Sequence, residues 1–170
     1  MKDMNLDPKR YNSRAIAGLI SDAKNELIGP ADFVQNVKNQ FDEIVAEVYA
    51  HYQKRLTNAN AMDFDDLIMR TVEVMQRFPE VRARYRSRFR HILVDEYQDT
   101  NTIQERILLL LAAKSNNICV VGDDDQSIYG WRGAKIENIF NFQKHYPEYR
   151  LIKLEQNYRS TGTILKAANK

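Results

Sequence analysis

Two short β-rich apolar runs, residues 92–94 and residues 118–121, constrain the fold of this chain most, because carboxylates follow each of them closely. Residues 103–114, between them, favour a helix that is apolar on most sides. A third such run, residues 151–154, follows a helical stretch at residues 136–146. Strands and helices that alternate in this order are typical of a parallel sheet with crossover helices. Ligands of such sheets bind at the carboxyl ends of the strands, and the polar motifs of this sequence lie there.

The residues before the first run favour helices and show almost no strand pattern between residues 8 and 89. One amphipathic helix is expected to begin at Gly29-Pro30 and to bury a stripe of side chains at three- and four-residue steps: Phe33, Val37, Phe41, Ile44, Val45, Val48 and Tyr52. Asp63 is expected to cap a second helix, and Pro79 to open a third. The expected fold class is therefore α/β, with an all-helical part ahead of a parallel sheet.

The composition is that of a soluble globular protein, with 44% hydrophobic and 28% charged residues among 170. The longest apolar stretch, residues 107–113, is much shorter than the roughly 20 residues that span a bilayer. Residues 1–10 lack the apolar core of a signal peptide. Cys119 is the only cysteine, so no internal disulfide can form. We therefore expect a cytoplasmic protein with no membrane partner.

The net charge of +2 is too small to indicate a nucleic-acid partner, but the positive charges are unevenly distributed. Five arginines alternate along one stretch: Arg82, Arg84, Arg86, Arg88 and Arg90. This cluster can face nucleic-acid phosphates, or it can be the solvated end of a helix. The sequence leaves both interpretations open.

Asp95 and Glu96 directly follow the first apolar run. One carboxylate at a strand end can hold Mg²⁺, mostly through water, while its neighbour polarises an attacking water. The competing interpretation is that both residues only cap the next helix. We expect Asp99 and Thr100 to cap that helix, which should begin near Thr102. Asp95 and Glu96 are then left without a structural role.

Residues 122–134 follow the second run and contain three consecutive aspartates, Asp123–Asp125. The spacing excludes a calcium loop, because Ile128 and Ala134 stand where a glycine and a bidentate glutamate belong. The segment also carries the amide of Gln126. Beyond it lies an aromatic and basic group that suits stacking with single-stranded nucleic acid: Tyr129, Trp131 and Arg132. Because glycines flank the last two, we expect Trp131 at the surface rather than in a core.

Tyr158 and Arg159 follow the third run, and an arginine beside a strand end can bind a terminal phosphate. With this group included, the sequence resembles the UvrD/Rep/PcrA family of superfamily 1 DNA helicases. DEYQDT at residues 95–100 resembles the Walker B motif of that family, GDDDQSIYGWRGA at residues 122–134 its third motif, and LEQNYRST at residues 154–161 its fourth. The three motifs also occur in the order and at the spacing of the family.

The resemblance implies a role for each matching residue. Asp95 would bind Mg²⁺, and Glu96 would activate the attacking water. Gln126 would sense the γ-phosphate of ATP, Tyr158 would stack on adenine, and Arg159 would reach the γ-phosphate. The contacts to single-stranded DNA would come from the aromatic and basic group of the third motif: Tyr129, Trp131 and Arg132.

The sequence lacks the loop of glycines followed by Lys and Ser or Thr that cradles phosphates in this family. It is therefore expected to be an internal fragment, with a helical insertion subdomain at residues 1–88 and part of a RecA-like ATPase domain at residues 89–170. The implied parent is an ATP-dependent DNA helicase or translocase that couples Mg-ATP hydrolysis to movement along single-stranded DNA in repair or replication. Its cofactors would be ATP and Mg²⁺. Its partners would be single-stranded DNA, duplex junctions and the remaining helicase domains, and the chain alone is expected to be inactive.

Two other functions stay open. A Mg²⁺-dependent nuclease could use Asp95, Glu96 and Asp123–Asp125, and it would cut DNA in a metal-dependent way as the isolated chain. A binding or regulatory module derived from a helicase would no longer hydrolyse ATP. An upstream phosphate-binding loop in the parent reading frame would separate that module from an active motor.

Overall fold

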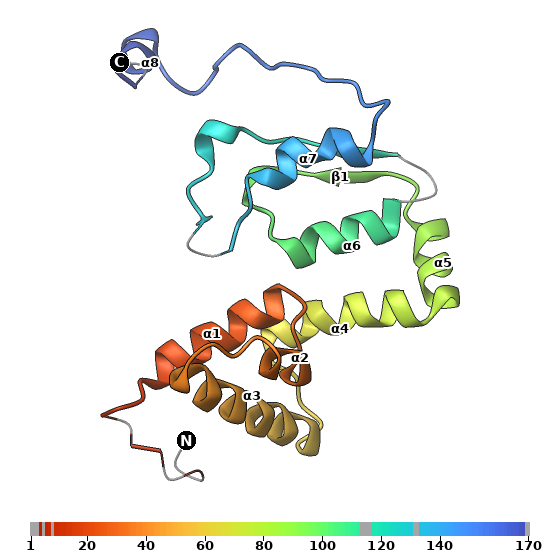
Figure 1. The fold of residues 1–170 in the computed structure, drawn as a ribbon. Coiled ribbons are helices and arrows are strands. Elements are labelled where there is room, and N and C mark those ends of the chain that lie inside the picture. The colour runs from red at the N-terminus through yellow and green to blue at the C-terminus, as the bar shows by residue number, and fades with distance from the viewer. Residues whose placement is uncertain (1–3, 5, 8, 113–116, 131–132, 169–170) are drawn as a thin grey trace.

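The chain folds into a group of helices followed by a small parallel sheet with its own helices (Figure 1). The computed structural model describes residues 4, 6–7, 9–112, 117–130 and 133–168. The first group consists of five helices: α1 Ser13–Asn25, α2 Pro30–Val34, α3 Gln40–Asn58, α4 Phe64–Arg77 and α5 Pro79–Arg88. The second part contains β1 Ile92–Val94, η2 Tyr97–Asp99, α6 Thr102–Ala112, β2 Ile118–Val120, η3 Asp124–Gln126, α7 Glu137–His145 and α8 Gly162–Ala168, where η marks a 3₁₀ turn.

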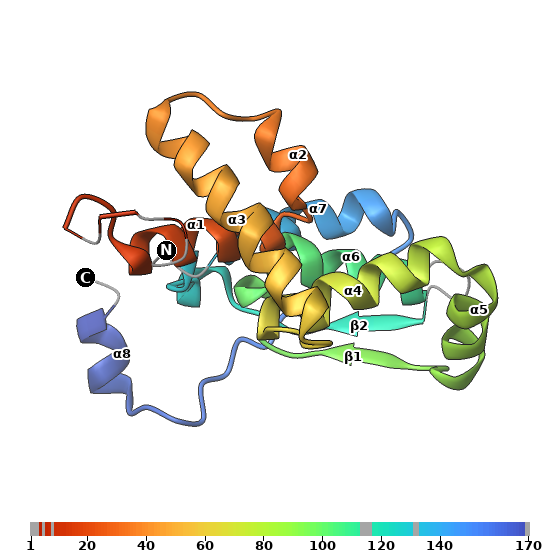
Figure 2. The ribbon, with the colours of Figure 1, turned by 90° about the horizontal axis from the view of Figure 1, so that it is seen from below.

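The two strands pair in parallel, and α6 makes the crossover between them (Figure 2). Ile92 lies opposite Ile118 and Val94 opposite Val120. The expected strand–helix–strand unit is therefore confirmed, and the described residues contain an α/β arrangement with a two-stranded sheet. Both strands run toward the segments that carry the acidic motifs, so these segments meet at one edge of the sheet.

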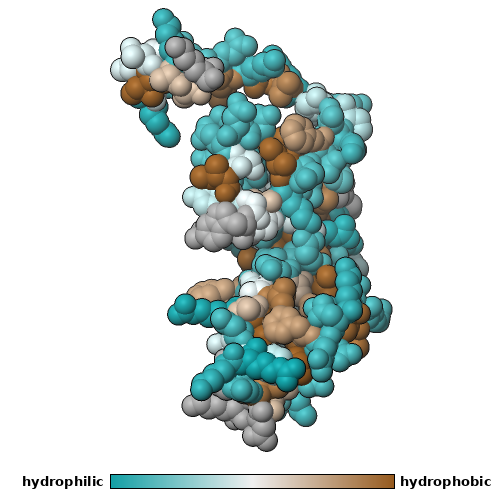
Figure 3. Space-filling model, turned by 60° about the vertical axis from the view of Figure 1, so that its left-hand side comes forward, coloured by the Kyte–Doolittle hydropathy of each residue, from teal (hydrophilic) through white to brown (hydrophobic). Residues whose placement is uncertain are grey.

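The third expected strand, residues 151–154, is wrong. These residues are extended but belong to no strand, and their chain leads away from the sheet toward α8 (Figure 1). Leu151 and Leu154 are 68% and 82% exposed, and hydrophobic side chains are visible on this end of the molecule (Figure 3). A strand needs a neighbour that accepts and donates its backbone hydrogen bonds, and no described strand lies beside these residues.

The single long helix expected from Gly29-Pro30 is also wrong, because the chain leaves α2 after Val34 and begins α3 at Gln40. Asn39 has an extended backbone, and its Oδ1 accepts hydrogen bonds from the N–H groups of Phe41 and Asp42 at 2.9 and 3.0 Å. A side chain that satisfies two first-turn amides starts a new helix there. The hydrophobic stripe is therefore shared by two helices.

Side-chain hydrogen bonds fix the starts of α4 and α6, whereas α5 begins at a proline without such a cap. The expected cap of α4 is confirmed, since Asp63 Oδ1 accepts from the N–H of Asp66 at 2.7 Å. Pro79 opens α5, as expected. The cap expected for α6 is wrong: Asn101 accepts from the N–H of Gln104 at 3.0 Å, and the side chain of Gln104 accepts from the N–H of Asn101 at 3.1 Å. This reciprocal pair takes the place expected for Asp99 and Thr100.

Two hydrophobic clusters hold the helices together. The first joins α1 and α3 through Ile16, Ile20, Ala23, Val45 and Tyr49. The second joins α4 to α6 through Met69, Val72, Met75, Ile103 and Leu110. Complete burial of one such side chain stabilises a fold by about 1.5–3 kcal/mol. The second cluster crosses the expected boundary after residue 88, so the helical part and the sheet part share a core.

Within the part of the chain that the structure describes, no helix has the length and apolar character needed to cross a bilayer. Cys119 is exposed on β2, with its thiol free.

Candidate active site

One cavity brings together residues of all three sequence motifs. It has a volume of about 490 Å³ and opens where β1 and β2 end. Every residue predicted to bind or act on the nucleotide lines it: Asp95, Glu96, Gln126, Tyr158 and Arg159. Val121, Gly122, Asp123, Leu154, Gln156 and Asn157 complete the lining. The sequence places these segments up to 64 residues apart, and the fold gathers them around one space.

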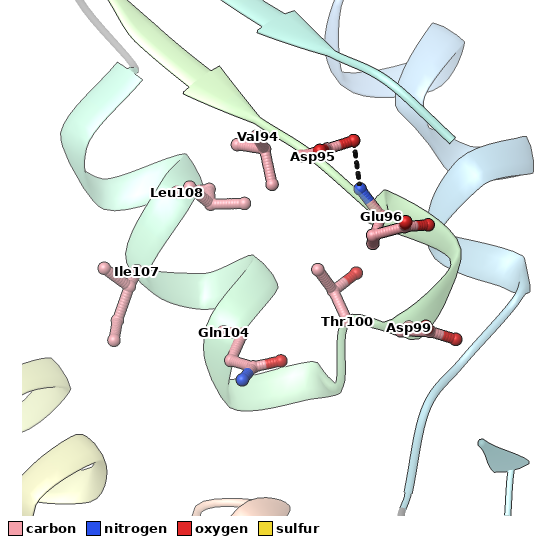
Figure 4. Close-up of a pocket in the computed structure, with 8 residues that line it drawn as sticks. All are labelled: Val94, Asp95, Glu96, Asp99, Thr100, Gln104, Ile107 and Leu108. Carbon is pink, nitrogen blue, oxygen red and sulfur yellow. Dashed lines mark hydrogen bonds between the residues drawn. The ribbon is translucent and has the colours of Figure 1, made fainter.

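The backbone turns sharply between Asp95 and Glu96. Glu96 has φ 50° and ψ 44°, in the left-handed region, and its N–H donates to Asp95 Oδ1 at 2.9 Å, as Figure 4 shows. A residue other than glycine in this region costs about 1–3 kcal/mol, and such strain is concentrated at functional sites. The strained turn directs the chain from β1 into η2, so that two adjacent carboxylates lie at the rim of the cavity.

A second cavity of about 440 Å³ is lined by the end of β1, the turn after it and α6. Val94, Thr100 and Leu108 point toward one another across it (Figure 4). Asp95 and Glu96 line both cavities.

Gln98 joins the first motif to the second, and sequence reasoning missed it. Its side chain is buried, with 1% of its surface exposed. The Nε2 atom donates to Glu96 Oε2 at 2.7 Å, and the Oε1 atom accepts from the N–H of Asp123 at 3.1 Å. A polar residue two positions after an acidic pair was the available signal. The partner on Asp123, 25 residues away, could be found only in the folded chain.

The segment after β2 is held by the side chain of Asp123. Its Oδ2 accepts from Gln126 Nε2 at 2.7 Å, and its Oδ1 accepts from the N–H of Asp125 at 3.1 Å. These bonds fix the amide of Gln126 at the cavity. Among the described residues, no group of three or more His, Cys, Asp or Glu side chains is arranged to hold a metal ion.

Asp95 by itself supplies enough protein ligands for a magnesium ion that is bound together with a nucleotide. Such ions take one or two protein carboxylates and complete their shell with phosphate oxygens and water. Asp95 is exposed, and the N–H of Glu96 engages only its Oδ1 atom, so the carboxylate can still offer an oxygen to an ion. The residues present therefore fit Mg²⁺ as a companion of a phosphate ligand.

Tyr158 and Arg159 reach the cavity from the extended segment that follows α7. Asn157 organises this segment, because its Oδ1 accepts from the N–H groups of Arg159 and Ser160, both at 2.9 Å. Tyr158 is 88% exposed, with its hydroxyl 3.3 Å from Gln156 Oε1. An exposed ring beside a cavity offers a flat face for a base. Asn157 was a second residue that sequence reasoning missed.

The residues predicted to contact DNA are placed only in part. Tyr129 lies beyond η3, is 38% exposed, and does not line either cavity. Trp131 and Arg132 lie outside the described residues. The surface position of Trp131 and the DNA contacts of all three therefore stay predictions.

A buried polar contact anchors α7 beneath the first motif. Asn138 is 3% exposed, and its Nδ2 donates to the carbonyl and the hydroxyl oxygen of Thr100, both at 3.1 Å. The N–H of Lys135 donates to the same carbonyl at 2.9 Å. Thr100 thus ties the start of α7 to the turn that carries the two carboxylates. Thr100 therefore holds α7, the helix that follows residues 122–134, and does not cap α6.

The ring of Tyr97 packs below this turn, in surroundings that disfavour charge. Burial raises the pKa of Tyr97, and the carboxylate of Glu105 raises it further. Burial also raises the pKa of Glu105, while the nearby His145 and Lys135 partly oppose the shift. Burial therefore disfavours the charged forms of Tyr97 and Glu105, whereas Asp95 and Glu96 are exposed.

Comparison with known proteins agrees with this geometry. Residues 1–147 match the family described as the UvrD/REP helicase N-terminal domain. Proteins named ATP-dependent DNA helicase PcrA from Leuconostoc citreum, Bacillus subtilis (strain 168) and Staphylococcus aureus (strain Mu50) are each 53% identical to the chain over 169 residues. Each alignment covers 99% of this chain and 23% of the relative. The chain thus spans about a quarter of the length of these curated relatives.

Proposed function

The chain belongs to the UvrD/REP helicase family, and from that premise we propose that it is part of an ATP-dependent DNA helicase that moves along single-stranded DNA. The observation that carries the proposal is the single cavity of about 490 Å³ that gathers Asp95, Glu96, Gln126, Tyr158 and Arg159. A site for phosphoryl transfer works mainly by positioning and electrostatics, so it needs such side chains around one space.

Each residue at the cavity has a proposed task. Asp95 would hold Mg²⁺, which when bound supplies positive charge to the phosphates. Glu96 accepts a proton from the water that attacks the γ-phosphate. The amide of Gln126 and the guanidinium of Arg159 bind the γ-phosphate oxygens. Tyr158 stacks on the adenine ring.

The organisation of the chain follows from the same proposal. Residues 89–170 would be part of a RecA-like ATPase domain, and residues 1–88 a helical insertion subdomain. The core shared by α4 and α6 supports a fixed rather than a mobile attachment of the helical part. The phosphate-binding loop and the other helicase domains would lie elsewhere in the full-length protein, so the 170 residues alone are expected to be inactive.

The DNA contacts are proposed for the segment after η3. Tyr129, Trp131 and Arg132 would bind single-stranded DNA, with the ring of Trp131 stacked on a base. Gln126 at the nucleotide and these three residues belong to one continuous segment. Hydrolysis of ATP can therefore alter the binding of single-stranded DNA next to a duplex junction.

The test is the ATPase activity of the full-length protein that contains this chain. We expect Mg²⁺-dependent hydrolysis that single-stranded DNA stimulates, and a loss of about 10²–10⁴-fold in Glu96→Gln, the usual worth of a general base. Glu148→Gln is the matched control, since Glu148 is exposed and lies outside the lining of both cavities. ATP hydrolysis that ignores DNA, or metal-dependent cutting of DNA without ATP, would contradict the proposal, and the second result would favour a nuclease.

A further inference from the structure

We propose that Gln98 is a positioning residue that holds the carboxylate of Glu96 and couples it to the segment carrying Gln126. This inference rests on the proposed function, in which Glu96 is the general base. It concerns a buried side chain that touches neither cavity and so lies outside the set of nucleotide-binding residues.

The orientation of the Gln98 amide is fixed by its two partners. A carboxylate can only accept a hydrogen bond, so the atom 2.7 Å from Glu96 Oε2 must be the donating Nε2. A backbone N–H can only donate, so the atom 3.1 Å from the Asp123 nitrogen must be the accepting Oε1. Both ends of the amide are satisfied at once, and a flipped amide would lose both bonds.

Glu96 needs such a support because it is exposed and sits on a strained turn. An exposed glutamate samples several rotamers, and a general base works only within hydrogen-bond reach of its water. A hydrogen bond from a buried amide, whose own position is set by packing, restricts that sampling. The geometry therefore points to Gln98 as the group that keeps Glu96 in place.

Gly122 shows how closely the second motif approaches Gln98. A Cβ atom at residue 122 would lie 2.8 Å from Gln98 Oε1 and 2.9 Å from Ile139 Cδ1. Both distances are shorter than real contacts of a Cβ atom. Glycine at this position thus allows the backbone that follows β2 to approach the amide of Gln98 closely.

The hydrogen bonds continue from Glu96 to the proposed phosphate sensor. Gln98 donates to Glu96 and accepts from the N–H of Asp123, whose Oδ2 in turn accepts from Gln126 Nε2 at 2.7 Å. If Gln126 shifts when it binds the γ-phosphate, its hydrogen bond would displace Asp123, and Asp123 would in turn displace Gln98. The position of the Glu96 carboxylate would then depend on whether the phosphate is bound.

The experiment compares turnover and ATP affinity for variants of the full-length protein. Gln98→Met keeps the length of the side chain but removes both hydrogen bonds. We expect kcat to fall by about 10²-fold, the loss caused by a displacement of about 1 Å at a reacting group, with ATP affinity unchanged. Gly122→Ala should act in the same direction by pushing Gln98 aside. Gln143→Met, at an exposed glutamine of α7, is the matched control and should keep normal turnover.

A double variant separates positioning from a general structural effect. If Gln98 acts through Glu96, adding Gln98→Met to Glu96→Gln should lower kcat no further, because the group that it positions is already gone. Independent losses that multiply, or a fall in ATP affinity as large as the fall in kcat, would overturn the inference. Should Gln98→Met fail to fold, the same comparison can be made with Gly122→Ala, introduced into the wild-type protein and into Glu96→Gln. A wild-type protein without DNA-stimulated ATPase activity would instead contradict the proposed function itself.

Discussion

The Nζ atom of Lys24 lies 2.6 Å from Asp63 Oδ2, although the side chain of Lys24 is only 1% exposed. The same ammonium group is 3.0 Å from Asp66 Oδ1, which is equally buried. Asp63 also caps α4, so one carboxylate both starts a helix and pairs with α1. This polar contact fixes α4 against α1, and α4 in turn packs on α6 beneath the candidate site.

Lys24→Met should therefore destabilise the chain strongly. The substitution leaves the buried carboxylate of Asp66 without its cation, and removing one partner of a buried pair costs about 3–5 kcal/mol. Urea denaturation followed by circular dichroism measures the change in the free energy of unfolding. Lys54→Met, at an exposed position of α3, should change it by no more than about 0.5 kcal/mol. Equal effects of the two substitutions would show that the buried pair adds nothing to stability.

The pairing of Asp63 should also make stability depend on pH. Burial raises the pKa of Asp63, but hydrogen bonds from Lys24, the N–H of Asp66 and the hydroxyl of Tyr52 outweigh it and lower the pKa below 3.8. A carboxyl with a lowered pKa contributes its full stability above the unfolded-state value, and the contribution is lost as pH falls through the folded-state value. We thus expect the contribution of Asp63 to the free energy of unfolding to be lost below about pH 4.

Asp63→Asn tests this dependence without removing the helix cap, since asparagine caps as well as aspartate. The variant should be less stable than the wild type at pH 7, and the difference should shrink as the pH is lowered toward 3. Unfolding free energies at several pH values give the comparison. A difference that stays constant over this range would mean that the ionisation of Asp63 does not contribute. The Tyr52 hydroxyl donates to Asp63, and burial together with this hydrogen bond raises the pKa of Tyr52 to about 12.

The sequence predicted best those features that depend on neighbouring residues. The end of β1 at Val94 follows from a short apolar run, and the starts of α4 and α5 follow from the cap Asp63 and from Pro79 in the first turn. The break before α3 was missed, because the amide bonds of Asn39 outweigh a hydrophobic period that continues across them. Periodicity describes which face is buried, and it does not show where one helix stops and another begins.

Features that depend on distant segments could not be predicted from local pattern. Residues 151–154 have the composition of a strand, yet pairing requires a neighbour that their own sequence cannot supply. Gln98 bonds to the backbone of Asp123, and Asn138 to Thr100. Neither contact leaves a spacing rule in the sequence. The motifs identified the groups that could do chemistry, and only the fold revealed the polar side chains that hold them.

Trp131 is the residue on which we expect affinity for single-stranded DNA to depend most. Aromatic side chains stack on bases of any sequence, and loss of one weakens binding by about 1–3 kcal/mol. Trp131→Ala in the full-length protein should therefore weaken binding of a fluorescent oligonucleotide by that amount, with ATP affinity in the absence of DNA unchanged. Trp131→Phe keeps a ring and should recover most of the loss. Unchanged DNA affinity together with unchanged DNA stimulation of the ATPase would rule out the stacking role.

Asp95 and Glu96 are adjacent at the end of β1, yet their substitutions should have different effects. Glu96→Gln keeps the size of the side chain and can still accept from Gln98 Nε2, but it removes the base. Turnover in the full-length protein should fall by about 10²–10⁴-fold while Mg-ATP still binds. Asp95→Asn removes the charge that would attract Mg²⁺, so it should weaken Mg²⁺-dependent nucleotide binding as well as turnover. Titration with a fluorescent nucleotide, with and without Mg²⁺, separates the two effects. If Glu96→Gln loses Mg-ATP affinity while Asp95→Asn keeps it, the two carboxylates have the opposite roles, since the metal-binding charge must then lie on Glu96.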